Sequence, residues 1–426
     1  MSRPKAALLA VKLPDEENTE FEASLAELAR LVTTLGYEVS ATLTQHRAQY
    51  TPATLIGSGK LQELVELTGY GENEGELEER RPGEHIELVA VDHDLTPTQL
   101  RNLEKACGAQ VLDRTGVIIE IFHRHAKSKK AKIEVELARL AYEAPRLRES
   151  PRGKEKQQGR GAGEAQLELD RRKIRDRMAE LREELELLQR EDRVRRAQRH
   201  DARRVALVGY TNAGKSSWMR ALTGSQVLVE DKLFATLDTT VRALHPEVTP
   251  RILVSDTVGF IKKLPHDLVA SFQSTLDEAL EASLLLLVAD ATDPGFREQL
   301  AVTQQVLGEI GATHVPSRLL LNKIDRLAET QLTELAHEFP DAWLASARRP
   351  PDVARIHGQI VDFFAADNIE GELFVPYDRQ RLIAELHQVG HVLQVDYQDA
   401  GVRVRVRADP QTLDRIRDLC AAAQSD

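Results

Sequence analysis

The sequence has very little cysteine: Cys107 and Cys420 are far apart and lack metal-ligand spacing. This excludes a disulfide framework and argues against a zinc site, and it suits the cytoplasm. Long hydrophobic runs are also missing, since the longest, around Leu284 to Ala289, is far too short to cross a bilayer. No signal-peptide cleavage pattern follows the first residues. We therefore expect a cytoplasmic protein without a membrane span, with partial membrane association left open.

Charge is distributed unevenly along the chain. The net charge is −11, yet residues 121–160 contain twelve Lys/Arg against five Glu, which is +7 and leaves −18 elsewhere. Such a basic segment suits a nucleic-acid phosphate backbone, because each neutralised phosphate releases counterions. The alternative is a solvated helix face beside an ordinary lysine-rich loop.

A glycine-rich motif with the spacing G-x-x-x-x-G-K-S follows the apolar run Val205–Val208. In this motif, backbone N–H groups face phosphate oxygens, the lysine neutralises the terminal phosphates, and the serine holds Mg²⁺ at a helix start. The sequence therefore predicts a nucleoside-triphosphate site, with Lys215 as a catalytic residue and Ser216 as a metal ligand. Its residues are Gly209, Tyr210, Thr211, Asn212, Ala213, Gly214, Lys215, Ser216 and Ser217.

Three further loops, each after a predicted strand, indicate that the base is guanine. Asp325 can accept both N1–H and N2–H₂ of guanine, a donor pair that adenine lacks. Asp256 can meet Mg²⁺ through water, while the N–H of Gly259 senses the γ-phosphate. A backbone N–H of the last loop can lie near the guanine carbonyl. Each loop alone can be an ordinary turn, but their order predicts a G domain. The loops are Asp256-Thr257-Val258-Gly259, Asn322-Lys323-Ile324-Asp325 and Ser346-Ala347.

The length of 426 residues predicts about two to four domains. Residues 1–125 alternate β-like runs with helical patterns, which indicates an α/β domain with a parallel sheet. Residues 126–200 predict a long antiparallel helical hairpin. Its helices cover 132–142 and 164–200, and residues 151–163 form a mobile, basic, Gly-rich loop. We expect a P-loop G domain with a mostly parallel sheet over 201–367 and a small α+β domain over 368–426. The fold class is therefore α/β multidomain.

The last domain contains the alternating strand 402–407. Its arginines either contact RNA or protein, or form the solvated face of an edge strand.

The chain resembles the HflX-type GTPases, which belong to the Obg-HflX group of translation-factor-related G proteins. The resemblance extends through nearly the whole chain. It rests on motifs that include Ile56-Gly57-Ser58-Gly59-Lys60, Val111-Leu112-Asp113-Arg114-Thr115-Gly116, Pro145-Arg146-Leu147, Phe234-Ala235-Thr236-Leu237-Asp238 and Asp256-Thr257-Val258-Gly259-Phe260.

The resemblance implies a GTPase that binds GTP/GDP with Mg²⁺, binds the large (50S) ribosomal subunit and its rRNA, and splits stalled ribosomes under stress. The loop of the hairpin then reaches toward the peptidyl-transferase region. We expect a monomer. Two alternatives remain: assembly of precursor large subunits, and a protein-effector switch without RNA binding.

Two departures from the family pattern occur. Gly161-Ala162-Gly163-Glu164 stands where the family has Gly-Pro-Gly-Glu, and the lost proline leaves the loop less preorganised. Thr239 replaces a proline that usually follows the Leu-Asp of the first switch.

The run Phe234-Ala235-Thr236-Leu237-Asp238, which corresponds to the first switch of the family, supplies further candidate residues. Phe234, Ala235 and Thr236 are predicted to contact the nucleotide. Thr236 is the predicted ligand of Mg²⁺ and a catalytic residue beside Lys215 and Gly259, with Thr239 and Thr240 as alternatives.

Phe260 occupies the place where many small GTPases carry a glutamine that orients the attacking water. Phenylalanine cannot hydrogen-bond water, so intrinsic hydrolysis should be slow and the ribosome is the expected activator.

Two further features leave alternatives open. Asn212 resembles the asparagine of G proteins that recruit K⁺, although it can instead brace the loop through a local hydrogen bond. Gly57-Ser58-Gly59-Lys60 invites a second, ATP site, but the start of a helix explains this short match better.

Overall fold

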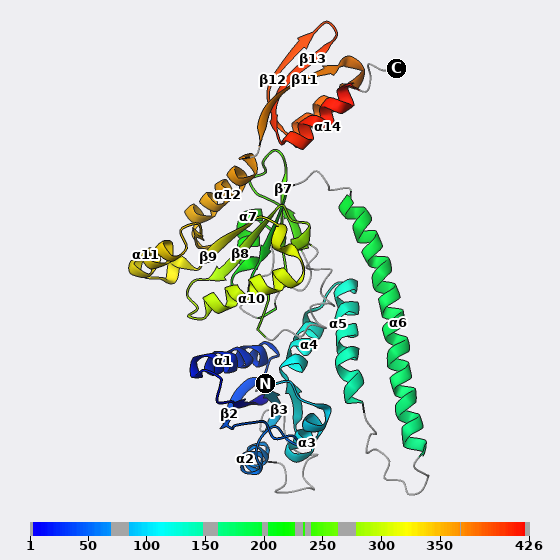
Figure 1. Cartoon of the computed structure of the whole chain (residues 1–426), viewed down its shortest axis with the longest axis vertical. Coiled ribbons are helices and arrows are strands. Elements are labelled where there is room, and N and C mark those ends of the chain that lie inside the picture. Colours follow the sequence, from blue (N-terminus) through cyan, green and yellow to red (C-terminus); the bar gives the residue numbers. More distant parts are fainter. Residues whose placement is uncertain are drawn as a thin grey trace. The chain divides into compact units, whose positions relative to one another are not determined.

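The computed structural model describes residues 3–69, 85–147, 161–197, 203–225, 233–234, 240–262, 278–366 and 368–421 (Figure 1). These residues form two compact units. One contains the described residues up to 189 together with Leu233 and Phe234, and the other contains the described residues from 190 onward, apart from that pair. Within the described residues, no helix is both long and apolar enough to span a membrane.

The first unit is built on a four-stranded parallel sheet with the order β2-β1-β3-β4. The central strand β1 has six consecutive buried residues, Ala6 to Val11, as a parallel strand covered on both faces requires. The strands are β1 (Lys5–Lys12), β2 (Glu38–His46), β3 (Ile86–Val91) and β4 (Gln110–Asp113). The helices of this part are α1 (Asn18–Thr34), α2 (Ser58–Thr68), α3 (Pro97–Cys107) and α4 (Arg114–His125).

Helix α5 (Lys129–Glu143) and helix α6 (Gly161–Ala197), which belongs to the first unit up to Gln189, lie side by side in Figure 1. Leu181 of α6 is buried against Ile133 and Leu137 of α5, with apolar neighbours at helical spacing around them. The predicted hairpin loop was too long by three residues, because α6 already begins at Gly161. Glycine is unfavourable in a helix interior, where ordering its flexible backbone costs entropy, but Gly161 and Gly163 lie in the first turn, at the end of the helix.

A buried aspartate ties α5 and the short helix after it to the sheet. Asp113, at the end of β4, accepts hydrogen bonds from the N–H of Gly116 (2.8 Å), the hydroxyl of Tyr142 (2.8 Å) and the guanidinium of Arg146 (2.9 Å). Arg146 lies in the short 3₁₀ helix η1 (Ala144–Arg146), which follows α5 directly. Burial and the Asp113 charge raise the pKa of Tyr142, so its phenol remains a donor.

The second unit contains a six-stranded sheet with the order β10-β9-β8-β5-β7-β6, parallel except for β6. Trp218 of α7 is fully buried in its core. The strands are β5 (Arg203–Val208), β6 (Thr240–Ala243), β7 (Ile252–Asp256), β8 (Leu284–Asp290), β9 (Ser317–Asn322) and β10 (Trp343–Leu344). The helices are α7 (Lys215–Thr223), α10 (Phe296–Glu309), η2 (Ala312–His314), η3 (Ile324–Arg326), α11 (Glu329–Glu338) and α12 (Pro350–Ala365). This arrangement confirms the mostly parallel P-loop fold.

The C-terminal part of the second unit is a two-layer α+β arrangement. Its antiparallel sheet has the order β11-β13-β12, and Val402, Val404 and Val406 of β13 are fully buried. The edge-strand interpretation of this arginine-bearing strand was wrong, because β13 is hydrogen-bonded on both sides. The elements are β11 (Ile369–Pro376), η4 (Tyr377–Arg379), α13 (Arg381–Val389), β12 (His391–Gln398), β13 (Gly401–Ala408) and α14 (Pro410–Ala421).

Candidate nucleotide-binding site

The predicted phosphate loop connects the carboxyl end of β5 to the start of α7. Gly209 has φ of +148°, and a Cβ there would lie 2.2 Å from the carbonyl oxygen of Val288. Gly214 has φ of +102°, and its Cβ would lie 2.2 Å from the side-chain amide of Asn322. Both positions therefore require glycine. The backbone N–H groups at the start of α7 remain available to an anion.

The buried ammonium of Lys215 is held by the loop that precedes it. Its Nζ donates to the carbonyl oxygens of Gly209 (3.0 Å) and Tyr210 (2.8 Å). An ammonium has three donors, and the described residues accept from two of them, so a phosphate oxygen can take the third. Burial lowers the pKa of Lys215 to about 8, partly opposed by the charge of Asp256. A polyanionic ligand would reverse this shift.

The two described residues predicted to serve Mg²⁺ lie together. The hydroxyl of Ser216 donates to a carboxylate oxygen of Asp256 at 2.7 Å. Hydroxyl and carboxylate oxygens are the hard donors that Mg²⁺ prefers, so the pair fits this ion. The third predicted ligand, Thr236, and its neighbour Ala235 lie outside the described residues, as does the alternative Thr239; Thr240 begins β6.

The loop after β7 pairs with the phosphate loop like a short strand. Phe260 donates from its N–H to the carbonyl of Gly209 (3.1 Å) and accepts from the N–H of Thr211 (2.8 Å). The phenol oxygen of Tyr210 accepts from the N–H of Lys262 at 2.7 Å. These bonds bring Thr257, Val258 and Gly259 beside the phosphate loop. The Phe260 side chain is buried, so it orients no water.

The predicted guanine loops are joined to the phosphate loop and to each other. The side-chain amide of Asn322 donates to the carbonyl of Ala213 (2.8 Å), and its oxygen accepts from the N–H of Ala347 (3.3 Å). The hydroxyl of Ser346 donates to Asp325 at 2.6 Å, and this bond is the main cause of the lowered pKa of Asp325. Asp325 is therefore held as a carboxylate, the form that can accept two guanine donors.

A residue absent from the sequence prediction, Asp290 at the end of β8, holds Lys323. The ammonium of Lys323 lies 2.6 Å from a carboxylate oxygen of Asp290 and donates to the carbonyl of Asn212 at 2.9 Å. Asp290 follows the apolar run Leu284–Ala289, and an acidic residue at the end of a buried parallel strand was the available signal.

Two phosphate-loop side chains differ in burial. Asn212 is exposed, has φ of +60°, and its side chain makes no hydrogen bond to a described residue. The loop-bracing bond is therefore missing from this part of the chain. The hydroxyl of Thr211 is buried and has no hydrogen-bond partner among the described residues. Ser217 lies in the first turn of α7, partly buried.

Phe234 of the first switch lies in the first unit. Its ring packs edge-on against Phe122 of α4, with centroids 4.6 Å apart, and is buried. The contact of this side chain with the nucleotide stays a prediction.

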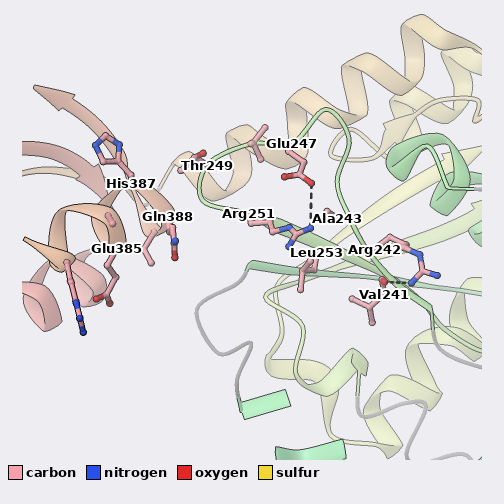
Figure 2. Close-up of a pocket in the computed structure, with 14 residues that line it drawn as sticks. Val241, Arg242, Ala243, Glu247, Thr249, Arg251, Leu253, Glu385, His387 and Gln388 are labelled. Atoms are coloured by element: carbon pink, nitrogen blue, oxygen red, sulfur yellow. Dashed lines mark hydrogen bonds and ion pairs between the residues drawn. The ribbon is translucent and has the colours of Figure 1, made fainter. Parts of the chain in front are cut away.

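A hollow of about 1050 Å³ is lined by β6, β7 and α13 and contains no residue predicted for the site. In Figure 2, Arg251 points toward Glu247, while Arg242 and Glu385 lie on opposite sides of the view. Arg251 pairs with Glu247 at 3.5 Å, and Arg242 donates to the carbonyl of Val241. The two dashed lines in Figure 2 mark these contacts.

This site defines a P-loop protein that binds guanine nucleotides. It combines, at one edge of the sheet, the phosphate loop, the paired Ser216 and Asp256, and the Asn322–Asp325 loop. Family models agree. The model described as 50S ribosome-binding GTPase matches residues 204–323, and those described as GTP-binding GTPase N-terminal and GTP-binding GTPase Middle Region match 22–123 and 125–199.

Curated relatives match the full chain. GTPase HflX of Gluconacetobacter diazotrophicus is 55% identical over 442 residues, which cover 98% of each chain. GTPase HflX of Escherichia coli is 34% identical over 413 residues, covering 95% of this chain and 93% of the relative. A crystal structure of a GTP-binding protein from Sulfolobus solfataricus with GDP is 26% identical, covers 84% of this chain and 99% of that chain, and gives a TM-score of 0.45. The chain belongs to the HflX family of GTPases.

Proposed function

We propose that this GTPase binds the large (50S) ribosomal subunit and its rRNA, and splits or rescues stalled ribosomes under stress, acting as a monomer. The observation that carries the proposal is the match of residues 204–323 to the 50S ribosome-binding GTPase model. The helical pair α5–α6 supports it, because the sequence that joins the two helices carries the basic stretch 148–160.

In this proposal, GTP binds with its phosphates around the start of α7. Lys215 donates its third hydrogen to the terminal phosphates, and Asp325 reads the base. Ser216 and Thr236 ligate Mg²⁺, with Asp256 acting through water; the ion supplies charge neutralisation at the transferring phosphate. The N–H of Gly259 is the proposed sensor of the γ-phosphate, because its loop already pairs with the phosphate loop.

The proposal that the ribosome activates hydrolysis is based on Phe260, which stands where many small GTPases have a glutamine that orients water. The side chain of Phe260 is buried and cannot form a hydrogen bond, so another group must orient the attacking water. Because phosphoryl transfer depends on positioning and electrostatics, a docked partner can raise the rate by orders of magnitude.

The testing experiment measures GTP hydrolysis by the purified protein alone, with large subunits, and with small subunits at equal concentration. We expect slow hydrolysis alone and stimulation only by large subunits. Tight GTP binding without stimulation by either subunit would contradict the proposal and favour a protein-effector switch. Co-sedimentation with precursor particles rather than mature subunits would favour the assembly role.

The exposed side chain of Asn212 carries a second proposal, that K⁺ binds beside the phosphates and stimulates hydrolysis. An amide oxygen that accepts no hydrogen bond from a described residue suits a monovalent cation. Single-turnover hydrolysis with large subunits should be faster in KCl than in NaCl; equal rates would refute the proposal.

A further inference from the structure

Asp325 depends on a neighbouring loop for its orientation. Ser346 lies between β10 and α12 and is almost fully buried. Its hydroxyl donates to Asp325 at 2.6 Å and accepts from the N–H of Arg348 at 3.2 Å. With the proton and a lone pair both engaged, the hydroxyl cannot rotate freely. The place of Ser346 therefore sets the direction of the Asp325 carboxylate.

Ser346 is in turn held by Asp352, in the first turn of α12. One carboxylate oxygen of Asp352 accepts from the N–H of Ser346 at 3.0 Å. The other accepts from the guanidinium of Arg355 at 2.9 Å, which also donates to the carbonyl of Leu344 at 2.6 Å. Each carboxylate oxygen of Asp352 thus has its own partner. Through Ser346 and Arg355, this carboxylate joins the Ser346 loop and β10 to α12.

This arrangement differs from an ordinary helix cap. A capping side chain accepts from an N–H in the first turn of its own helix. Asp352 is already inside α12, and the N–H it accepts belongs to Ser346, which lies before that helix begins. Pro350 and Pro351, which open α12, have no N–H to cap. The carboxylate therefore serves the loop.

We propose that Asp352, held by Arg355, is a positioning residue for guanine specificity that acts through Ser346 on Asp325. The inference rests on the base-reading role of Asp325 proposed above. Asp352 touches no nucleotide. Its loss releases the Ser346 N–H, the loop shifts, and Asp325 no longer meets both donors of the guanine edge.

The test compares GDP with inosine diphosphate, which retains N1–H but lacks the exocyclic amino group. Affinities are measured by competition against a fluorescent GDP. Asp352→Ala should lower GDP affinity about tenfold, the loss of one buried hydrogen bond and its charged acceptor, while inosine diphosphate affinity changes less. The ratio of the two affinities therefore falls. Asp352→Asn keeps an acceptor for Ser346 and should lie between this variant and the parent.

Asp362→Ala supplies the matched control, because Asp362 is an exposed aspartate on the same helix. It should leave the ratio unchanged. If Asp352→Ala lowers the melting temperature but retains the parental ratio, Asp352 only stabilises the fold and the inference is wrong.

Asp325→Asn tests the base-reading role of Asp325 separately from the positioning role of Asp352. An unchanged ratio in Asp325→Asn would overturn the base-reading role itself. A changed ratio in Asp325→Asn with an unchanged ratio in Asp352→Ala would overturn only the positioning role.

Discussion

Lys215 is a buried lysine whose charged form is disfavoured until an anionic ligand binds. Its pKa of about 8 lies below the ordinary value for lysine, because burial disfavours the charged form. Phosphate oxygens at the same place favour the charged form and raise the pKa. Above about pH 8 the free protein has lost this proton in part, so nucleotide binding must take a proton up.

We therefore predict that GDP affinity falls as the pH rises from about 8 to 9, by up to about tenfold per pH unit. Calorimetric titrations in two buffers with different ionisation enthalpies should detect proton uptake at about pH 9 and little at about pH 7. Lys60→Met is the control, since Lys60 pairs with Glu63 in the first unit. GDP binding without proton uptake at the higher pH would show that Lys215 remains charged without ligand.

Site residues that belong to a contiguous sequence motif could be predicted from the sequence. Site residues that contact such a motif from a distant part of the chain could not. Lys215 and Asp325 stand in loops whose spacing alone suggests phosphate and guanine. Asp290 and Asp352 are each held to the site by one contact, to Lys323 and to Ser346 respectively. The place of Asp290 after a buried strand indicates the edge of the sheet but not its partner Lys323, and nothing in the sequence around Asp352 indicates its contact with Ser346.

The junction between the phosphate loop and the loop after β7 is tightly packed. A Cβ on Gly259 would lie 2.8 Å from Thr211 Cγ2, 2.9 Å from Thr211 Cα and 3.0 Å from Lys215 Nζ. The backbone atom cannot move aside cheaply, so one of the two loops must shift.

We predict that Gly259→Ala lowers GTP hydrolysis with large subunits at least tenfold, because the shift moves Lys215 and the γ-phosphate sensor apart. Gly308→Ala is the matched control: Gly308 lies in α10, and its Cβ would meet nothing within 4 Å. It should retain activity and gain about 0.5–1 kcal/mol of stability from helix propensity. If Gly259→Ala hydrolyses GTP at the rate of the parent protein, the two loops can accommodate the added methyl group and the prediction is wrong.

Helices and strands with strong periodicity were predictable, whereas neighbours within a sheet were not. The run Ala6–Val11 predicts β1, and the apolar stripe around Leu181 predicts α6. The alternation of 402–407 predicts a strand but not its place. Only the pairing of β13 with both β11 and β12 makes it central.

Over the whole chain, the positive charge of residues 121–160 is partly neutralised by the protein itself. Four of its cations in the described part lie against carboxylates: Arg124 with Glu120 (2.9 Å), Lys129 with Glu184 (2.5 Å), Arg139 with Glu143 (2.7 Å) and Arg146 with Asp113 (2.9 Å). The proposed rRNA footprint therefore falls mainly on the cations of 148–160, which lie outside the described residues.

We predict that the double reversal Lys154→Glu/Lys156→Glu weakens large-subunit binding and reduces its salt dependence by about one unit of slope per lost phosphate contact. Arg251→Glu/Arg318→Glu, an equal reversal at exposed positions of the second unit, should change binding little. Co-sedimentation at several salt concentrations measures both. Equal losses in the two variants would indicate that net charge alone attracts the subunit.

Contacts with α5, at Leu181 and at the ion pair between Arg177 and Glu136, hold one part of α6. From Arg177 to Gly161 the helix extends about 24 Å, at about 1.5 Å per residue. A tilt of about 8° at Arg177 moves that end by about 3 Å, close to the length of helix axis, about 3.4 Å, that one phosphate of one strand occupies in a duplex. Small rearrangements near α5 can therefore shift the far end of α6 by a whole nucleotide step.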